Sequence, residues 1–166
     1  KRNEKIDSTI LKNEIEKKYQ RDIEYSLLNG LLTGDELSKA ARMLKLKDTA
    51  QYCVVSFHTI SSNSEDYYTK EELEEIGVIE GEIQRLLPDE HIYRNLNQIV
   101  CIHEIKPGET QAGFREEMEK LYQTVQKQIF HRNKTTDFQI GIGSIVNGYG
   151  DLKKSFKDSK KIIDYM

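Results

Sequence analysis

The stretch YCVVSFHTI, residues 52–60, is rich in β-branched and aromatic side chains, a composition typical of a β-strand. Downstream of it, Thr69 and Glu72 have the spacing of a helix-capping box. Hydrophobic periodicity and turn residues then predict a helix, two strands, a helix and a strand, over residues 69–87, 91–95, 98–105, 110–131 and 138–143. Only Leu96-Asn97 separates the two middle strands, which suits a tight hairpin.

This order divides into two strand–helix–strand units joined by a hairpin, the ferredoxin-like pattern of the α+β class. Because each unit needs a right-handed crossover, we expect one antiparallel four-stranded sheet with its helices on one face. The strands that contain Cys53 and Cys101 should then be neighbours at the centre of the sheet.

Helices are expected on both sides of this unit. A long first helix covers residues 1–32, where Leu11, Ile15, Tyr19, Ile23 and Leu27 recur every four residues. This strict spacing drifts around a straight helix. A second helix, residues 36–46, has Asp35 as its expected N-cap, and a last one, residues 151–166, begins at Asp151.

Composition limits what the chain can be. Its 166 residues suit one domain with a helical arm, and 28 acidic against 25 basic residues exclude a chain-wide nucleic-acid surface. No apolar run approaches the roughly 20 residues of a membrane span, and no signal peptide is present, so we expect a cytoplasmic protein; the lack of an initiator Met indicates a piece of a longer chain. Cys53 and Cys101 are expected to be buried thiols in a reducing compartment; a disulfide or a reactive thiol is the alternative.

Three segments resemble parts of degenerate GGDEF-like domains. FQIGIG, residues 138–143, and the helix with Leu152, Ser155, Phe156 and Ser159 match the end of such domains, and LLNGLLTG, residues 27–34, matches their opening segment. The resemblance spans about residues 20–166. Such domains sit within bacterial transcription regulators of the AraC type and in two-component signal transduction. The resemblance therefore implies a receiver or membrane sensor upstream and a helix-turn-helix DNA-binding domain downstream.

Cyclase activity is not expected. Two-metal nucleotidyl transfer needs carboxylates that hold Mg²⁺, and the active family carries an Asp after the first strand and a Gly-Gly-acid hairpin. Here the first strand ends FHTIS, residues 57–61, with no acid before Glu65, and the hairpin reads YRNLNQ, residues 93–98. We therefore expect no catalytic, cofactor-binding or metal-binding residue and no cofactor.

Three other patterns are open to a functional interpretation. His58 and His103 lie on strands predicted to be neighbours and could approach each other across the sheet, as a structural pair or as a pH- or metal-sensing pair. Gly141 and Gly143 could belong to a phosphate loop, but glycines in a strand more often mark a bulge or close helix packing. The acidic residues 64–90 are a solvated face or a docking surface for a basic partner.

The leading hypothesis is a non-catalytic signal-relay domain that couples an upstream sensor to a downstream DNA-binding domain. Residues 1–33 are expected to form a signalling and dimerisation helix, and residues 34–166 the GGDEF-like domain, without direct nucleic-acid contact. The predicted homodimer contact is made by Leu11, Ile15, Tyr19 and Ile23. The alternatives are a small-molecule sensor that uses the old cyclase cleft and a residual nucleotide-processing enzyme.

Overall fold

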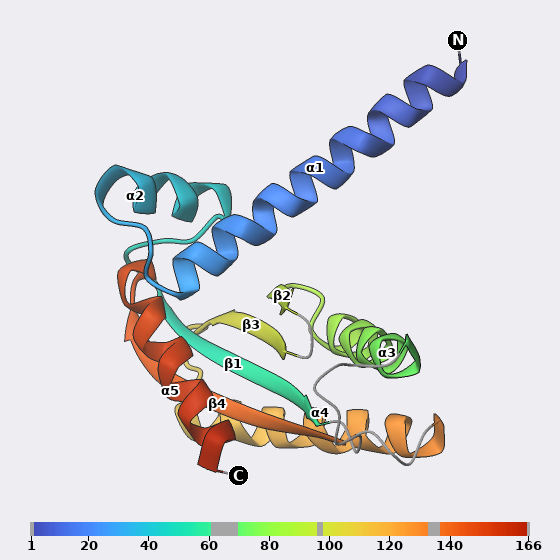
Figure 1. Ribbon diagram of the computed structural model, residues 1–166. Helices are drawn as coiled ribbons and strands as arrows, with labels where there is room; N and C mark the ends of the chain where they lie inside the picture. The colour runs from blue at the N-terminus through green and yellow to red at the C-terminus, as the bar shows by residue number, and fades with distance from the viewer. Residues whose placement is uncertain (1, 61–69, 96–97, 133–136, 166) are drawn as a thin grey trace.

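The structure, a computed structural model, describes the backbone of residues 2–60, 70–95, 98–132 and 137–165 and the side chains of 10–59, 70–94, 98–128 and 138–161. Figure 1 shows the arrangement of its elements. In chain order these are α1 (Arg2–Leu28), α2 (Gly34–Met43), β1 (Gln51–Ile60), α3 (Lys70–Leu86), β2 (His91–Asn95), β3 (Gln98–Glu104), α4 (Gln111–Arg132), β4 (Asp137–Asn147), the 3-10 turn η1 (Tyr149–Asp151) and α5 (Leu152–Tyr165).

The four strands form one antiparallel sheet in the order β2-β3-β1-β4. This confirms the α+β class and the expected ferredoxin-like order. It also confirms that the strands with Cys53 and Cys101 are central neighbours, since Val55 pairs with Cys101. The expected hairpin turn at Leu96-Asn97 lies outside the described residues.

The two crossover helices, α3 and α4, lie on one face of the sheet, as expected, and α1, α2 and α5 cover the other face. Cys53, Val55 and Phe57 of β1 pack with α3 and α4. Their alternate neighbours, Tyr52 and Val54, pack with α1, α2 and α5. Because successive residues of a strand point to opposite faces, a strand that is apolar at nearly every position needs cover on both.

Two helix boundaries differ from the sequence-based expectation. Helix α1 ends at Leu28 rather than near Leu32. Helix α2 begins at Gly34, so its N-cap position is Thr33, and Asp35 lies in the first turn instead of capping the helix. Gly34 has a φ of 58°, a left-handed conformation that favours glycine and lets the chain reverse between the two helices.

The IGIG strand and the serine helix pack together closely, which confirms the packing interpretation of Gly143. A Cβ on Gly143 would lie 2.1 Å from the Ser155 carbonyl oxygen. The β1–β4 register also shifts between Cys53 and Val55. At that shift the Ser155 hydroxyl accepts a hydrogen bond from the Val54 N–H at 2.8 Å and donates one to the Ser144 carbonyl at 2.6 Å. Ser155 therefore completes the backbone hydrogen bonding that the bulge interrupts.

Both thiols are buried and unpaired, as expected. Cys53 donates to the Gly143 carbonyl, with 3.2 Å between sulfur and oxygen. Burial raises the pKa of the Cys53 thiol to about 12 and that of Cys101 well above its usual value. Neither thiol is therefore a nucleophile at neutral pH.

Candidate functional site

The positions that carry cyclase chemistry meet at one end of the sheet. His58, near the end of β1, pairs with Gln98, the first residue of β3, and Gln98 pairs with Asn95 at the end of β2. The fold thus brings the ends of β1 and β2 together across the first residue of β3. The sequence supplies neither an acid nor a glycine in these strand ends or in the turn between them.

His58 and His103 do not approach each other, so the expected histidine pair is wrong. His58 pairs with Gln98, whereas His103 pairs with Cys53, five residues away along β1. Positions 53 and 58 also differ in parity, so the two imidazoles lie on opposite faces of the sheet. Strands β1 and β3 are far apart in the sequence, so only the register of their pairing shows that the two histidines are separated.

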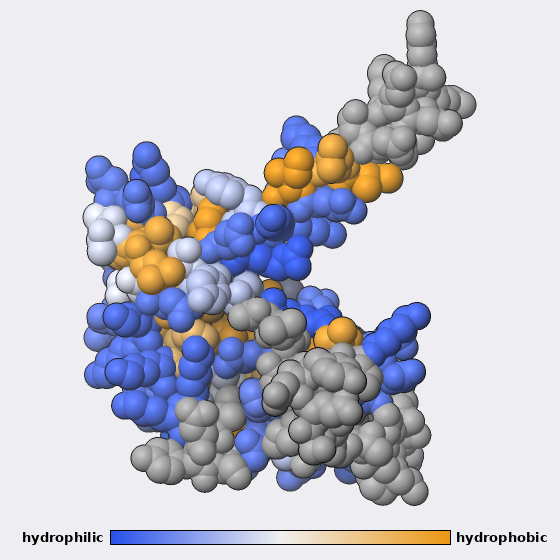
Figure 2. All heavy atoms as spheres, viewed as in Figure 1, coloured by the Kyte–Doolittle hydropathy of each residue, from blue (hydrophilic) through white to orange (hydrophobic). Residues whose placement is uncertain are grey.

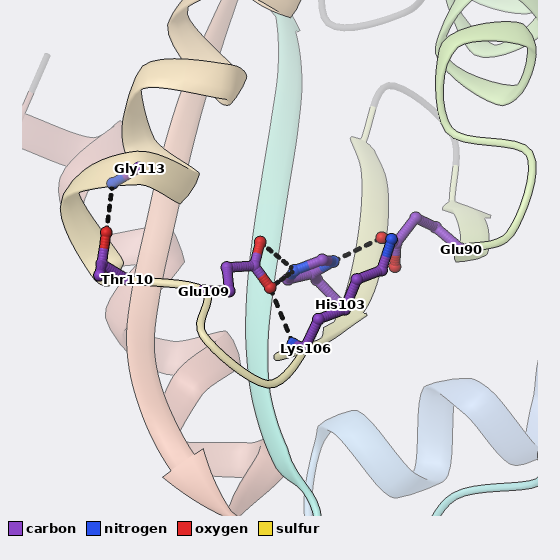
Figure 3. Close-up of polar contacts among 6 residues, drawn as sticks. All are labelled: Glu90, His103, Lys106, Glu109, Thr110 and Gly113. Carbon is purple, nitrogen blue, oxygen red and sulfur yellow. Dashed lines mark hydrogen bonds and ion pairs between the residues drawn. The ribbon is translucent and has the colours of Figure 1, made fainter.

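The partners of His103 are two glutamates from loops beside the sheet (Figure 3). Its Nδ1 contacts Glu90, and its Nε2 lies 2.9 and 3.0 Å from the two carboxylate oxygens of Glu109. Glu109 also accepts the Lys106 N–H at 2.9 Å. The Phe114 ring stacks on the imidazole at 4.3 Å between centroids.

This cluster favours a charged imidazole. Burial by itself lowers the pKa of His103, but the hydrogen bonds and charges of Glu90 and Glu109 outweigh burial and raise the pKa. Burial opposes ionisation of Glu109 too, but the Lys106 N–H and His103 lower its pKa overall. Because both ring nitrogens are engaged, His103 ties the α3–β2 loop to the β3–α4 loop and has no free nitrogen for acid–base chemistry.

A cavity of about 580 Å³ opens beside the cluster, lined by the two loops and the first turns of α4. Among the described residues, no group of three or more His, Cys, Asp or Glu side chains is arranged to hold a metal ion. Sequence reasoning missed this cluster because Glu90 and Glu109 lie in loops whose approach depends on the sheet. The usable signal was turn residues, Pro88 and Pro107-Gly108, beside each acid.

Helix α1 is the other candidate, because it carries exposed apolar side chains. Leu11, Ile15 and Tyr19 are 58%, 60% and 57% exposed. Figure 2 shows hydrophobic side chains on the part of α1 that projects from the body. Ile23, the fourth predicted contact residue, is half-buried and packs against the core of α1, α2 and α5. The structure thus leaves three of the four predicted contact residues open to a partner.

The exposed residues lie on the side of α1 that faces away from the body. Successive residues of an α-helix are rotated by about 100°. Glu24, Leu27 and Leu28 are buried and define the face toward the body. Counted from that face, Leu11 and Ile15 fall on the opposite side of the helix. A second molecule can therefore reach them without meeting this copy's own sheet.

The inner side of α1 borders a polar cleft of about 630 Å³ against α3 and β2. Glu24 lines this cleft and is only 4% exposed. Its carboxylate accepts a 3.3 Å hydrogen bond from Gln20. Burial raises the pKa of Glu24 to about 7, with Gln20 and Arg21 opposing the shift. Glu24 thus marks the point where the exposed helix becomes part of the core.

Comparison with models of known protein families shows to which family the chain belongs. A family model described as GGDEF-like domain matches residues 29–165. The chain belongs to the GGDEF-like domain family. No curated protein matches it in sequence. In this GGDEF-like domain the family match begins directly after α1, so the projecting helix lies outside the matched region.

Within the GGDEF-like domain, the tail residues that carry the resemblance are structural. Besides Ser155, Ser56 donates to the Ser159 hydroxyl at 2.7 Å, and Ser159 donates to the Phe156 carbonyl at 2.6 Å. These bonds hold α5 on β1 and β4. In the described part of the chain, no helix has the length and apolar character needed to cross a membrane.

Proposed function

We propose that this GGDEF-like domain is a non-catalytic relay of a bacterial transcription regulator. It couples an upstream receiver or sensor to a downstream helix-turn-helix domain, and α1 is the homodimer contact. The observation that carries this proposal is the exposure of Leu11, Ile15 and Tyr19 on a helix whose other end is buried in the domain core. A change in the pairing of two α1 helices is thereby connected mechanically to both domain bodies.

The absence of catalysis is supported by the residues at the cyclase positions. Nucleotidyl transfer through two metal ions needs acids at the end of β1 and in the hairpin, and the sequence has none there. We expect no cyclic dinucleotide from GTP with Mg²⁺ or Mn²⁺. Product above a buffer control in chromatography of the reaction mixture would contradict this part of the proposal.

The relay is tested in the full-length regulator with a transcriptional reporter. The double variant Leu11→Asp/Ile15→Asp should uncouple transcription from the upstream signal, because it removes the contact and leaves the core intact. The matched variant Lys12→Asp/Glu16→Asp changes the same turns of the helix without removing an apolar side chain, and it should respond like the unmodified protein. A normal response from the first variant would refute the relay through α1.

A small-molecule sensor in the old cyclase cleft is the second candidate, and the polar cleft beside α1 reaches Arg94, near the end of β2. Calorimetry with nucleotides and common metabolites separates this candidate from the relay. Binding that changes neither self-association nor transcription would favour an independent sensor.

A further inference from the structure

The outer face of α1 contains a second repeat besides the apolar stripe. Five of its residues are spaced alternately by four and three, which is the spacing of the two core positions of a coiled-coil heptad: Leu11, Ile15, Lys18, Asp22 and Tyr25. All five are exposed, and Tyr25 is 45% exposed although it lies beside the buried end of the helix. This face, which we call the α1 seam, is apolar at its two ends and charged in the middle.

The two charges in the middle of the α1 seam distinguish the possible orientations of a second copy. In a parallel pair in register, Lys18 would face Lys18 of the second copy, and Asp22 would face Asp22. Two like charges that face each other across the helix pair, which form one layer of the contact, oppose association. In an antiparallel pair centred near residue 20, Lys18 faces Asp22 of the second copy twice, and Ile15 faces Tyr25 twice. Only the antiparallel pair matches charge with opposite charge.

The surroundings of the α1 seam leave these charges available. Among the residues that the structure describes, Lys18 and Asp22 form no ion pair within the chain. The neighbouring cations Lys17 and Arg21 line the cleft on the inner side of the helix and do not compete for the partner's acid. Tyr19 lies at the border of the seam, close to the two-fold axis of an antiparallel pair.

We propose that α1 pairs with a second copy of itself in antiparallel orientation, with Lys18 on Asp22 and Ile15 on Tyr25 of the other copy. This inference rests on the homodimer of the proposed function and specifies its geometry. It places the two domain bodies at opposite ends of the helix pair, so their separation is fixed by the length of α1 between Ile15 and Tyr25.

Charge exchange tests the contact on the whole chain. Lys18→Asp alone, or Asp22→Lys alone, should weaken self-association about fivefold or more in sedimentation equilibrium, because each puts like charges in both central layers. The double variant Lys18→Asp/Asp22→Lys should recover the association constant of the unmodified chain. Circular dichroism checks that the fold is kept. Single variants without effect, or a double variant that stays weak, would overturn the antiparallel pair.

Disulfide trapping tests the orientation independently. The native thiols are buried, so an introduced cysteine is the reactive one. Ile15→Cys alone should give no cross-link with oxidised glutathione, whereas an equal mixture of Ile15→Cys and Tyr25→Cys should give a 15–25 disulfide, identified by peptide mass.

The outcomes of trapping separate the two proposals. A 15–15 disulfide overturns the antiparallel orientation and leaves the homodimer of the proposed function in place. A dimer in sedimentation that forms neither disulfide also overturns the orientation. A monomer at every concentration refutes the homodimer itself, and the antiparallel pair with it.

Discussion

The two halves of α1 have the same secondary structure and opposite surroundings. From Ile10 to Asp22 every side chain is exposed, whereas Leu27 and Leu28 are 2% and 1% exposed in the core that α1 shares with α2 and α5. The stripe of apolar residues at every fourth position passes from one half to the other without interruption. The difference teaches that periodicity identifies a helix, while the surroundings decide which part of the helix is buried and which part stays exposed.

The largest expected effect comes from truncating matched leucines in the two halves. Leu28→Ala should lower the free energy of unfolding by about 3 kcal/mol, because a buried side chain leaves a cavity. Leu11→Ala should change it by less than about 0.5 kcal/mol at a concentration where the chain is monomeric. Urea denaturation measures both. Similar losses for the two variants would mean that the exposed half is also packed against the domain.

The next effect depends on pH and on Glu24, where the halves meet. Its pKa rises from about 4.5 in the unfolded chain to about 7 in the folded one, so the folded state binds the proton more tightly. The contribution of the Glu24 carboxyl to the free energy of unfolding is therefore fully present below pH 4.5 and is lost as the pH rises through 7. Glu24→Gln should raise the free energy of unfolding by about 2 kcal/mol at pH 8 and leave it nearly unchanged at pH 4.5.

Glu14→Gln is the matched control for Glu24→Gln, since Glu14 lies in the exposed half. It should leave the free energy of unfolding unchanged at both pH values. Equal stabilisation by the two substitutions would point to the net charge of the helix, and not to the burial of Glu24, as the cause.

The His103 cluster gives a smaller effect elsewhere in the molecule. The pKa of His103 is raised in the folded state. The contribution of His103 to stability is therefore fully present below its unfolded pKa of about 6.5 and is lost as the pH rises through its folded pKa. His103→Gln should reduce stability more at pH 5.5 than at pH 9, by about 1 kcal/mol of difference. A loss that is the same at both pH values would show that packing on Phe114 is its whole contribution.

The sequence predicted much of the fold, because turn chemistry and periodicity are local. The central position of the Cys53 and Cys101 strands follows from element order, and close packing at Gly143 follows from a glycine within a strand. The cover on the second face of the sheet, the separation of His58 from His103 and the Glu90–His103–Glu109 contacts were missed. Each depends on a register or a loop approach between segments far apart in the chain, and no local pattern encodes these.

For the candidate site, the sequence identified the residues of α1 but not their separate environments. The every-fourth spacing places Ile23 with Leu11, Ile15 and Tyr19, yet Ile23 lies where α1 meets α2 and α5. A stripe that drifts around the helix faces the domain body at one end and solvent at the other. The residue at which the stripe changes from buried to exposed depends on where the domain body ends, and the three-dimensional packing determines that position.

Sedimentation equilibrium of the unmodified chain and of Leu11→Asp/Ile15→Asp tests the central claim, that the exposed half of α1 is a self-association surface. We expect a weak, concentration-dependent dimer for the unmodified chain. The double variant should be a monomer with an unchanged thermal midpoint, since both substituted side chains are in water in the single copy. A monomer at every concentration for the unmodified chain, or a double variant that unfolds, would contradict the account.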